Sequence, residues 1–315
     1  MRQSTLIAAL SGAASTMAAP LIEKRADFAA PPGGDTTILN YALTLEYLER
    51  RFYQEGVANY TEAEFCDAGL PQDVYANLMT IYYDEQQHVS FLSTALGKSA
   101  VHEATYSFPS TTASEFLALA AVLEGVGVSA YLGAAAAIAN KAYVPVAGSI
   151  LTTESRHSAY IRHALGEKFA AKPYDTPLDF NQVYSLAAEF ITGFAPGDPA
   201  LPFKAFPALT VVPSSPVVQP DMSSIVFKGA AKSAGLSSST KVYAVFYSGL
   251  DTYYAPVTMT GDDYTLAKVP GANFSSAGQL APSGQVYVVL STANGTTTAN
   301  DENTISGVGI VPFQS

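Results

Sequence analysis

Apolar residues recur every three to four positions from about Asp35 to Gly193, which is the spacing of helices that bury one face. Capping residues, prolines and glycines give the bounds of five predicted helices. They run from Asp35, as the cap, to about Gly56, from Pro71 to Gly97, from Thr112 through small residues up to Ala139, from Pro145 to Gly166, and from Leu178 to Thr192.

The connection between the second and third helices is unusually long. About 14 residues there have no helical pattern. Fully extended, they reach about 46 Å, which exceeds the length of a helix of about 25 residues. The chain can therefore cross from one end of a helical bundle to the other, so that two antiparallel hairpins are joined by one crossover.

The pattern changes after Gly193. Prolines accumulate over residues 195–220, which predicts a linker or an extended cover over the helices. Further on, β-branched and aromatic runs at Lys241–Ser248 and Gln285–Ser291 predict strands of a small β-sandwich over 221–315, where we find no catalytic constellation. The predicted fold class is α+β multidomain: a four-helix bundle with a fifth helix, followed by this β-sandwich.

The N-terminus has the pattern of a targeting segment. A positive start, an apolar run and a small-residue cleavage site predict a signal peptide over residues 1–18. The pair Lys24-Arg25 favours a propeptide over 19–25, the alternative being a chance pair of surface charges, and the helical domain then spans 26–194. The apolar run is too short to span a bilayer, and we find no later stretch apolar enough to do so. We therefore expect a secreted protein, either extracellular or in the cell wall.

Charge and cysteine content narrow the function classes. The formal net charge is −11 and there is no basic run, which argues against partners such as nucleic acid or an anionic membrane. The single cysteine, Cys66, excludes an intramolecular disulfide, and we expect it to be buried rather than to form an intermolecular bridge. Glycosylation sequons at Asn59, Asn273 and Asn294 agree with secretion, although such tripeptides also arise by chance.

Glutamate and histidine occur twice in one order along the predicted helices. The order is a lone glutamate followed by a Glu-x-x-His motif on the next helix, and the residues are Glu46, Glu85, His88, Glu124, Glu154 and His157. A glutamate and a histidine three residues apart lie on one face of a helix. The surrounding segments are apolar, and a buried charge must be paired or bound to metal.

This donor set suits a particular kind of metal site. Four carboxylates and two imidazoles form a mixed oxygen and nitrogen shell that fits iron or manganese. The carboxylates neutralise two divalent cations and leave coordination positions open for dioxygen, peroxide or water. The alternative is that these are ordinary surface glutamates and hydrogen-bonded histidines. The repeated order favours the metal site.

Residues 35–166 resemble the ferritin-like superfamily, in which two helices each give one glutamate and two others each give a Glu-x-x-His motif. The segments Leu43-Thr44-Leu45-Glu46-Tyr47-Leu48-Glu49, Asp84-Glu85-Gln86-Gln87-His88 and Leu123-Glu124-Gly125 look closest to a secreted branch. That branch contains fungal stress-response and late-sexual-development proteins and plant desiccation-related proteins. The resemblance covers roughly half of the chain, and it implies that the six residues named above are the metal ligands.

Some assignments have close alternatives. Glu49 lies one turn beyond Glu46 and could replace it as a ligand. We prefer Glu46 because Tyr53 follows it by seven residues, as Tyr131 follows Glu124. These tyrosines either pack in the core or also hydrogen-bond the site, and packing is the favoured interpretation. The other two histidines, His102 and His163, lie off the predicted faces and are expected to be non-ligands.

Two functions from different classes remain. The first is a di-metal oxidoreductase, ferroxidase-like or catalase-like, that acts on dioxygen, peroxide or ferrous iron. The second is a non-catalytic extracellular or cell-wall-associated stress or developmental protein with a structural or vestigial metal site. The resemblance cannot separate them, because the same ligands serve ferroxidases, manganese catalases and oxygenases. A storage cage is disfavoured, because the β domain and glycans crowd a closed shell.

Overall fold

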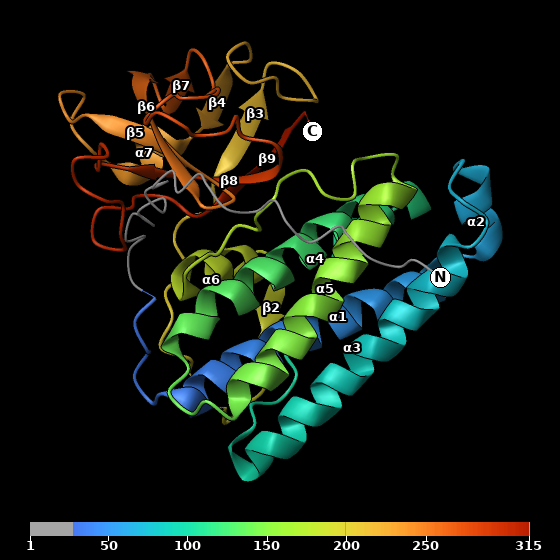
Figure 1. Ribbon diagram of the computed structural model, residues 1–315. Helices are drawn as coiled ribbons and strands as arrows, with labels where there is room; N and C mark the ends of the chain where they lie inside the picture. The colour runs from blue at the N-terminus through green and yellow to red at the C-terminus, as the bar shows by residue number, and fades with distance from the viewer. Residues whose placement is uncertain (1–27, 199, 315) are drawn as a thin grey trace, which may run out of the picture.

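The computed structural model describes residues 28–198 and 200–314, with a helical part below and a β-sheet above it in Figure 1. The predicted signal peptide and propeptide lie outside the described residues.

Four long helices form the helical part: α1 (Asp35–Asn59), α3 (Val74–Leu96), α4 (Ala113–Ala134) and α5 (Tyr143–Ala164). Helix α1 packs along α3 and α4, and α5 packs along α4 and α3. The α3–α4 connection crosses the helices and contains a 3₁₀ turn, η1 (Gly97–Ser99), and a short strand, β1 (Thr105–Tyr106). A second 3₁₀ turn, η2 (Ala135–Ala137), follows α4.

The predicted helix ends need three corrections. Gly34 rather than Asp35 is the N-cap of α1, and the Asp35 carboxylate instead accepts hydrogen bonds from the backbone of Ala139 and Asn140. A short helix between α1 and α3, α2 (Glu62–Asp67), was not predicted. The fifth predicted helix is also shorter than expected.

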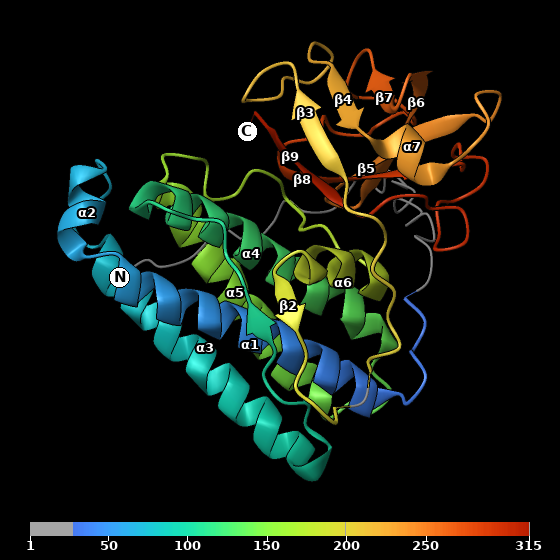
Figure 2. The ribbon, with the colours of Figure 1, turned by 180° about the vertical axis from the view of Figure 1, so that it is seen from behind.

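That fifth helix, α6 (Phe180–Ala188), begins at a capping box formed by Asp179 and Gln182. It ends early because the chain turns into strand β2 (Ile191–Gly193), which pairs with β1 of the crossover. A two-stranded sheet therefore holds the crossover to the segment that follows α6 (Figure 2).

The C-terminal part is an antiparallel sheet of seven strands in the order β3-β4-β7-β6-β5-β8-β9, accompanied by the short helix α7 (Ala230–Ala234). The strands are β3 (Thr210–Pro213), β4 (Ile225–Lys228), β5 (Val242–Ser248), β6 (Asp251–Thr260), β7 (Asp263–Leu266), β8 (Gly284–Ser291) and β9 (Gly309–Phe313). Strand β6 pairs with β5 through Val257 and with β7 from Thr258, and the edge strands β3 and β9 contact each other. The strands thus form one antiparallel sheet that curls around its own apolar core, where a small β-sandwich was predicted.

Both faces of this sheet are buried along its central strands β5 and β8. Along β5 and β8, residues such as Phe246 and Val288 pack inside the curled sheet, whereas their neighbours Tyr247 and Tyr287 pack against the helices. The Tyr287 hydroxyl donates a 2.7 Å hydrogen bond to the backbone oxygen of Gly125 in α4. The sheet and the helices therefore share one apolar core.

The proline-rich segment is part of this packing. Phe203 stacks on Phe180, with ring centroids 5.2 Å apart, and meets Tyr41 edge-on. Strand β3 begins at Thr210, within the stretch expected to be a linker, because its residues pair with β4. The extended-cover alternative describes 200–209 better than a free linker does.

Helix α4 contradicts the expectation that no stretch after the N-terminus is apolar enough to span a bilayer. The stretch Ala113–Ala137 is long and apolar enough, by length and composition, to cross a bilayer. Two-thirds of its most apolar window, 67%, is buried inside the fold. Its apolar composition follows from its central place, since it contacts α1, α5 and α6 and lies under the sheet.

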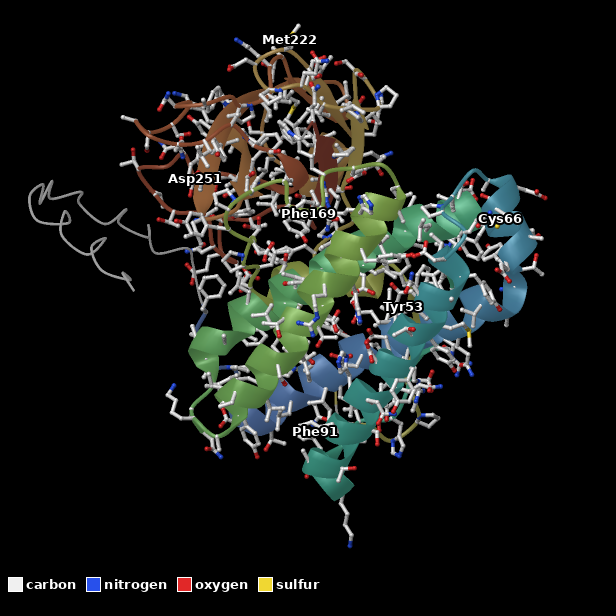
Figure 3. All side chains as sticks on the ribbon, turned by 45° about the vertical axis from the view of Figure 1, so that its right-hand side comes forward. Tyr53, Cys66, Phe91, Phe169, Met222 and Asp251 are labelled. Carbon is white, nitrogen blue, oxygen red and sulfur yellow. The ribbon has the colours of Figure 1, made fainter. Side chains whose placement is uncertain are left out.

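Surface positions give one further correction. Cys66 lies exposed on α2, at the far end of the helical part (Figure 3), because that short helix turns only Phe65 into the core. The expectation of a buried cysteine is wrong. The three sequon asparagines, Asn59, Asn273 and Asn294, are all exposed.

Candidate metal centre

Each of the four long helices contributes to one buried cluster of acids and histidines. Helices α1 and α4 supply a lone glutamate each, and α3 and α5 each supply a Glu-x-x-His motif. All four glutamates have an exposed fraction of 0%, and both histidines are nearly inaccessible. The residues are Glu46, Glu85, His88, Glu124, Glu154 and His157.

The six side chains form two overlapping groups of donors. One contains Glu46, Glu85, His88 and Glu154, and the other contains Glu85, Glu124, Glu154 and His157. Within each group the donor atoms lie within 4.8 Å of one another. Glu85 and Glu154 belong to both groups, so the structure brings together all six residues that the sequence singled out.

The imidazoles face the carboxylates at short range. Nδ1 of His88 lies 3.1 Å from Glu46, 3.2 Å from Glu85 and 3.3 Å from Glu154. Nδ1 of His157 lies 3.2 Å from Glu85 and 3.3 Å from Glu124. Both rings therefore direct the same nitrogen at the cluster.

The opposite nitrogen of His157 has its own acidic partner. Its Nε2 lies 3.1 Å from the carboxylate of Asp84, which is partly exposed. A carboxylate behind a histidine ring fixes the ring's orientation, as in many metal sites. Sequence reasoning missed this role, although Asp84 directly precedes Glu85 in the quoted motif.

Two tyrosines cross the cluster. Tyr53 of α1 donates a hydrogen bond to Glu124 of α4, and Tyr131 of α4 donates one to Glu46 of α1. Each tyrosine thus bonds the glutamate of the facing helix, because α1 and α4 run antiparallel. Both are buried, and Figure 3 shows Tyr53 between the helices. They pack in the core and also hydrogen-bond the cluster.

Comparison with known proteins agrees with this arrangement. Residues 34–167 match the family model described as a ferritin-like domain. This part of the chain, called the ferritin-like region below, is similar to a ferritin-like domain. The ferritin-like region contains all six clustered residues and excludes the sheet. The chain is also similar to Protein rds1 of Schizosaccharomyces pombe, at 22% identity over 296 residues that cover 81% of this chain and 74% of that protein.

Several buried polar atoms of the cluster have no hydrogen bond. Among the described residues these include one carboxylate oxygen each of Glu85 and Glu124, both oxygens of Glu154, and Nδ1 of His157. The His157 nitrogen is close to two carboxylates but lacks hydrogen-bond geometry with them. Buried polar atoms in native proteins are normally paired, with an ion where no protein partner exists. The cluster is therefore compatible with a carboxylate–histidine metal site.

The same crowding of charge alters proton binding. Burial raises the pKa of Glu85 to about 7, although the nearby imidazoles of His157 and His88 act in the opposite direction. Burial, together with the charges of Glu85 and Glu124, raises the pKa of Glu154 well above its ordinary value. Without cations, some of these carboxyl groups keep their protons near neutral pH.

The histidines respond in the complementary way. Burial alone lowers the pKa of His157, but the charge of Glu124 and the short contacts with Glu124 and Glu85 outweigh it and raise the pKa to about 12. For His88, the short contacts with Glu154, Glu46 and Glu85 likewise outweigh burial and raise the pKa. Protonated imidazoles thus balance carboxylate charge that metal cations would otherwise balance.

The remaining candidates lie outside the two donor groups. Among the described residues the groups contain Glu46 and not Glu49, which is nevertheless buried next to the cluster. His102 is exposed and pairs with Asp198 at 2.6 Å, and His163 is exposed near the end of α5.

Proposed function

We propose that the ferritin-like region holds two divalent metal ions, iron or manganese, and that the protein is an oxidoreductase acting on dioxygen, peroxide or ferrous iron. The pair of donor groups that share Glu85 and Glu154 carries this proposal. Shared carboxylates are the usual bridges between two ions, and four carboxylates match the charge of two divalent cations. Glu46 and His88 complete one site, and Glu124 and His157 complete the other.

The residues around the ligands set their orientation. Tyr131 and Tyr53 hold Glu46 and Glu124, and Asp84 holds the His157 ring so that Nδ1 stays directed at the cluster. When bound, the metals supply electron exchange with dioxygen, peroxide or ferrous iron. The apolar surroundings keep bulk water away from the carboxylates.

The setting that we propose is extracellular. The predicted signal peptide and three exposed sequon asparagines support secretion. Association with the cell wall and a role in stress or sexual development rest on the resemblance of the Glu46, Glu85 and Glu124 segments to the secreted branch. One observation favours a non-catalytic metal site as the second candidate: the complete burial of all four carboxylates restricts access to them.

Metal analysis of protein made through a secretory pathway tests the proposal. We expect close to two iron or manganese ions per chain, and loss of stoichiometric binding in His88→Ala and His157→Ala, because each histidine supplies one of two nitrogen donors. The chain provides matched controls, since His102→Ala and His163→Ala change exposed histidines outside the cluster and should keep the metal.

Turnover separates the two candidates. Peroxide consumption and dioxygen-dependent oxidation of ferrous iron are measured on the loaded protein and on the two ligand variants. Turnover that disappears with the metal supports the oxidoreductase. Two bound ions without either activity support the structural role, and absence of bound metal under all loading conditions contradicts both.

A further inference from the structure

A cavity of about 220 Å³ lies where the sheet covers the ferritin-like region. Helices α1, α4 and α6 form one side, and strands β3 and β9 form the other. Its lining is mostly apolar and includes Leu48, Leu123, Val126, Leu186, Val211 and Ile310. Because both halves of the fold contribute, the cavity exists only while the sheet is docked.

Glu49 is the exception in this apolar lining. Its side chain is 4% exposed, and its Oε2 has no hydrogen-bond partner among the described residues. The other acidic residue of the lining, Glu189, lies at the exposed mouth. A buried polar atom without a partner is unfavourable, so the site is built for a molecule that supplies one.

The absence of a side chain at residue 127 connects the cavity to the carboxylate cluster. A methyl group on Gly127 would lie 2.8 Å from Oε1 of Glu49 and 3.1 Å from Oε2 of Glu154. Contacts this short do not occur without movement of the neighbours. Gly127 therefore allows the carboxyl groups of Glu49, in the cavity, and Glu154, in the cluster, to approach the same point of α4.

We propose that this cavity binds a small, mostly apolar molecule with one hydroxyl group, which hydrogen-bonds Glu49 at the inner end. An apolar cavity of about 150 Å³ already binds benzene, so this one accommodates a substituted benzene ring or a short alkyl chain. A hydroxyl group pairs with a carboxyl group in either protonation state. An anion is repelled by the neighbouring carboxylates, and an ammonium brings three donors to one unpaired acceptor.

The cavity can be tested as a binding site and, separately, as a substrate site for the metal centre. As a substrate site for the metal centre, it rests on the proposed function. As a binding site it does not, because Glu49 and the apolar lining are outside the two donor groups. Binding is therefore measured on both metal-stripped and metal-loaded protein, and metal content is determined separately.

Three probes of equal size decide the chemistry of the ligand. Calorimetric titration of the full chain compares benzyl alcohol, ethylbenzene and benzylamine. We expect benzyl alcohol to bind about two- to tenfold more tightly than ethylbenzene, as one net hydrogen bond provides. This preference should disappear in Glu49→Leu and persist in Glu49→Gln. Tighter binding of benzylamine would overturn the choice of a hydroxyl compound, and equal binding of all three would overturn the role of Glu49.

Neighbouring alanines of α6 provide the control for location. Ala187 lines the cavity and Ala188 does not, so Ala187→Leu should weaken benzyl alcohol binding at least tenfold while Ala188→Leu leaves it unchanged. If Ala187→Leu fails to fold, the preference of the natural chain for benzyl alcohol over ethylbenzene, together with its loss in Glu49→Leu, still decides. Equal affinity in both folded alanine variants, or no binding at millimolar benzyl alcohol, would overturn the proposal.

Discussion

At the scale of single residues, the cluster is organised by two crossed tyrosine–glutamate bonds. Tyr53 and Tyr131 hydrogen-bond the glutamates of the facing helices, so each helix orients a candidate metal ligand of its neighbour. Burial raises the pKa of both tyrosines well above 10.0, and the charge of the bonded glutamate adds to the increase. Both hydroxyl groups therefore remain protonated donors at neutral pH.

Removing either hydroxyl should weaken metal binding while the fold persists. In Tyr53→Phe or Tyr131→Phe a buried carboxylate oxygen loses its donor, which costs about 1–3 kcal/mol of unfolding free energy. Loss of an orienting partner lowers metal affinity by about 10- to 100-fold. Competition with a calibrated chelator measures the affinity, and urea unfolding measures the stability.

Tyr47→Phe is the matched control for this experiment. Tyr47 lies on the same helix, and its hydroxyl contacts Ser93 at 3.4 Å, outside the cluster. Its loss should leave metal affinity unchanged. Affinities of Tyr53→Phe and Tyr131→Phe that match the control would show that the tyrosines only pack.

Sequence alone predicted the meeting of the six donors but not their surroundings. Helical spacing tells which residues share a face, and a repeated motif tells which faces meet. It does not tell what lies opposite, so the hydrogen bond between His157 and Asp84 and the cavity beside Glu49 were not predicted. Cys66 was misplaced because nothing in its local pattern marked the short helix α2.

At the scale of elements, α4 is the helix on which the other parts meet. Its glycines allow close approach: a methyl group on Gly133 would lie 1.8 Å from the backbone oxygen of Leu178, just before α6. The backbone of Leu178 also donates to the oxygen of Ser129 at 3.1 Å. The small residues of α4 thus serve the docking of a neighbouring segment.

Two glycine-to-alanine changes in helices should therefore have opposite signs. Gly133→Ala forces backbone against backbone, and we expect a loss of about 1–3 kcal/mol in unfolding free energy. Gly148→Ala on α5 meets nothing within 4 Å and should gain about 0.5–1 kcal/mol, because alanine is the better helix former. Urea unfolding of both variants checks this, and a stabilised Gly133→Ala would contradict the close approach.

Element bounds were predictable where capping and breaking residues were unambiguous. Thr112 caps the third helix as expected, and the runs around Val242–Ser248 and Gly284–Ser291 are strands. The fifth helix was predicted too long because the pairing of β2 with β1 is a contact distant in sequence. The curl of the sheet depends on β6 changing partners, which no local pattern records.

At the scale of the whole molecule, the sheet is part of the core of the helical region. Tyr247 and Tyr287 bury against the helices, and Gln285 donates to the backbone oxygen of Val122 at 3.2 Å. Strands with both faces buried read as continuous apolar runs, which do not reveal that a second layer covers them. For this reason the sequence predicted a separate domain after a linker, whereas the structure has a common core.

The last prediction concerns the stability of this whole unit without metal. The pKa values of Glu49 and Glu154 are raised well above 4.5, mainly by burial, and that of Glu85 is raised to about 7. The folded chain therefore holds protons that the unfolded chain loses above about pH 4.5. This stabilisation is fully present below the unfolded pKa and is lost as pH rises through the folded values. Between the unfolded and the folded pKa, each such group lowers the unfolding free energy by about 1.4 kcal/mol for each unit by which the pH rises.

Bound metal should reverse this dependence, because ligands must release protons to bind and acid then competes with the metal. Metal-loaded protein is thus expected to be most stabilised over metal-free protein near pH 7, with the two converging towards pH 4.5. Unfolding free energies of both forms from about pH 4.5 to 7.5 test this. Glu49→Gln removes one buried acid that lies outside the donor groups, so it should flatten the metal-free profile while keeping the metal. Metal-free protein whose stability does not fall across this range would show that the carboxyl groups are not a buried, proton-holding cluster.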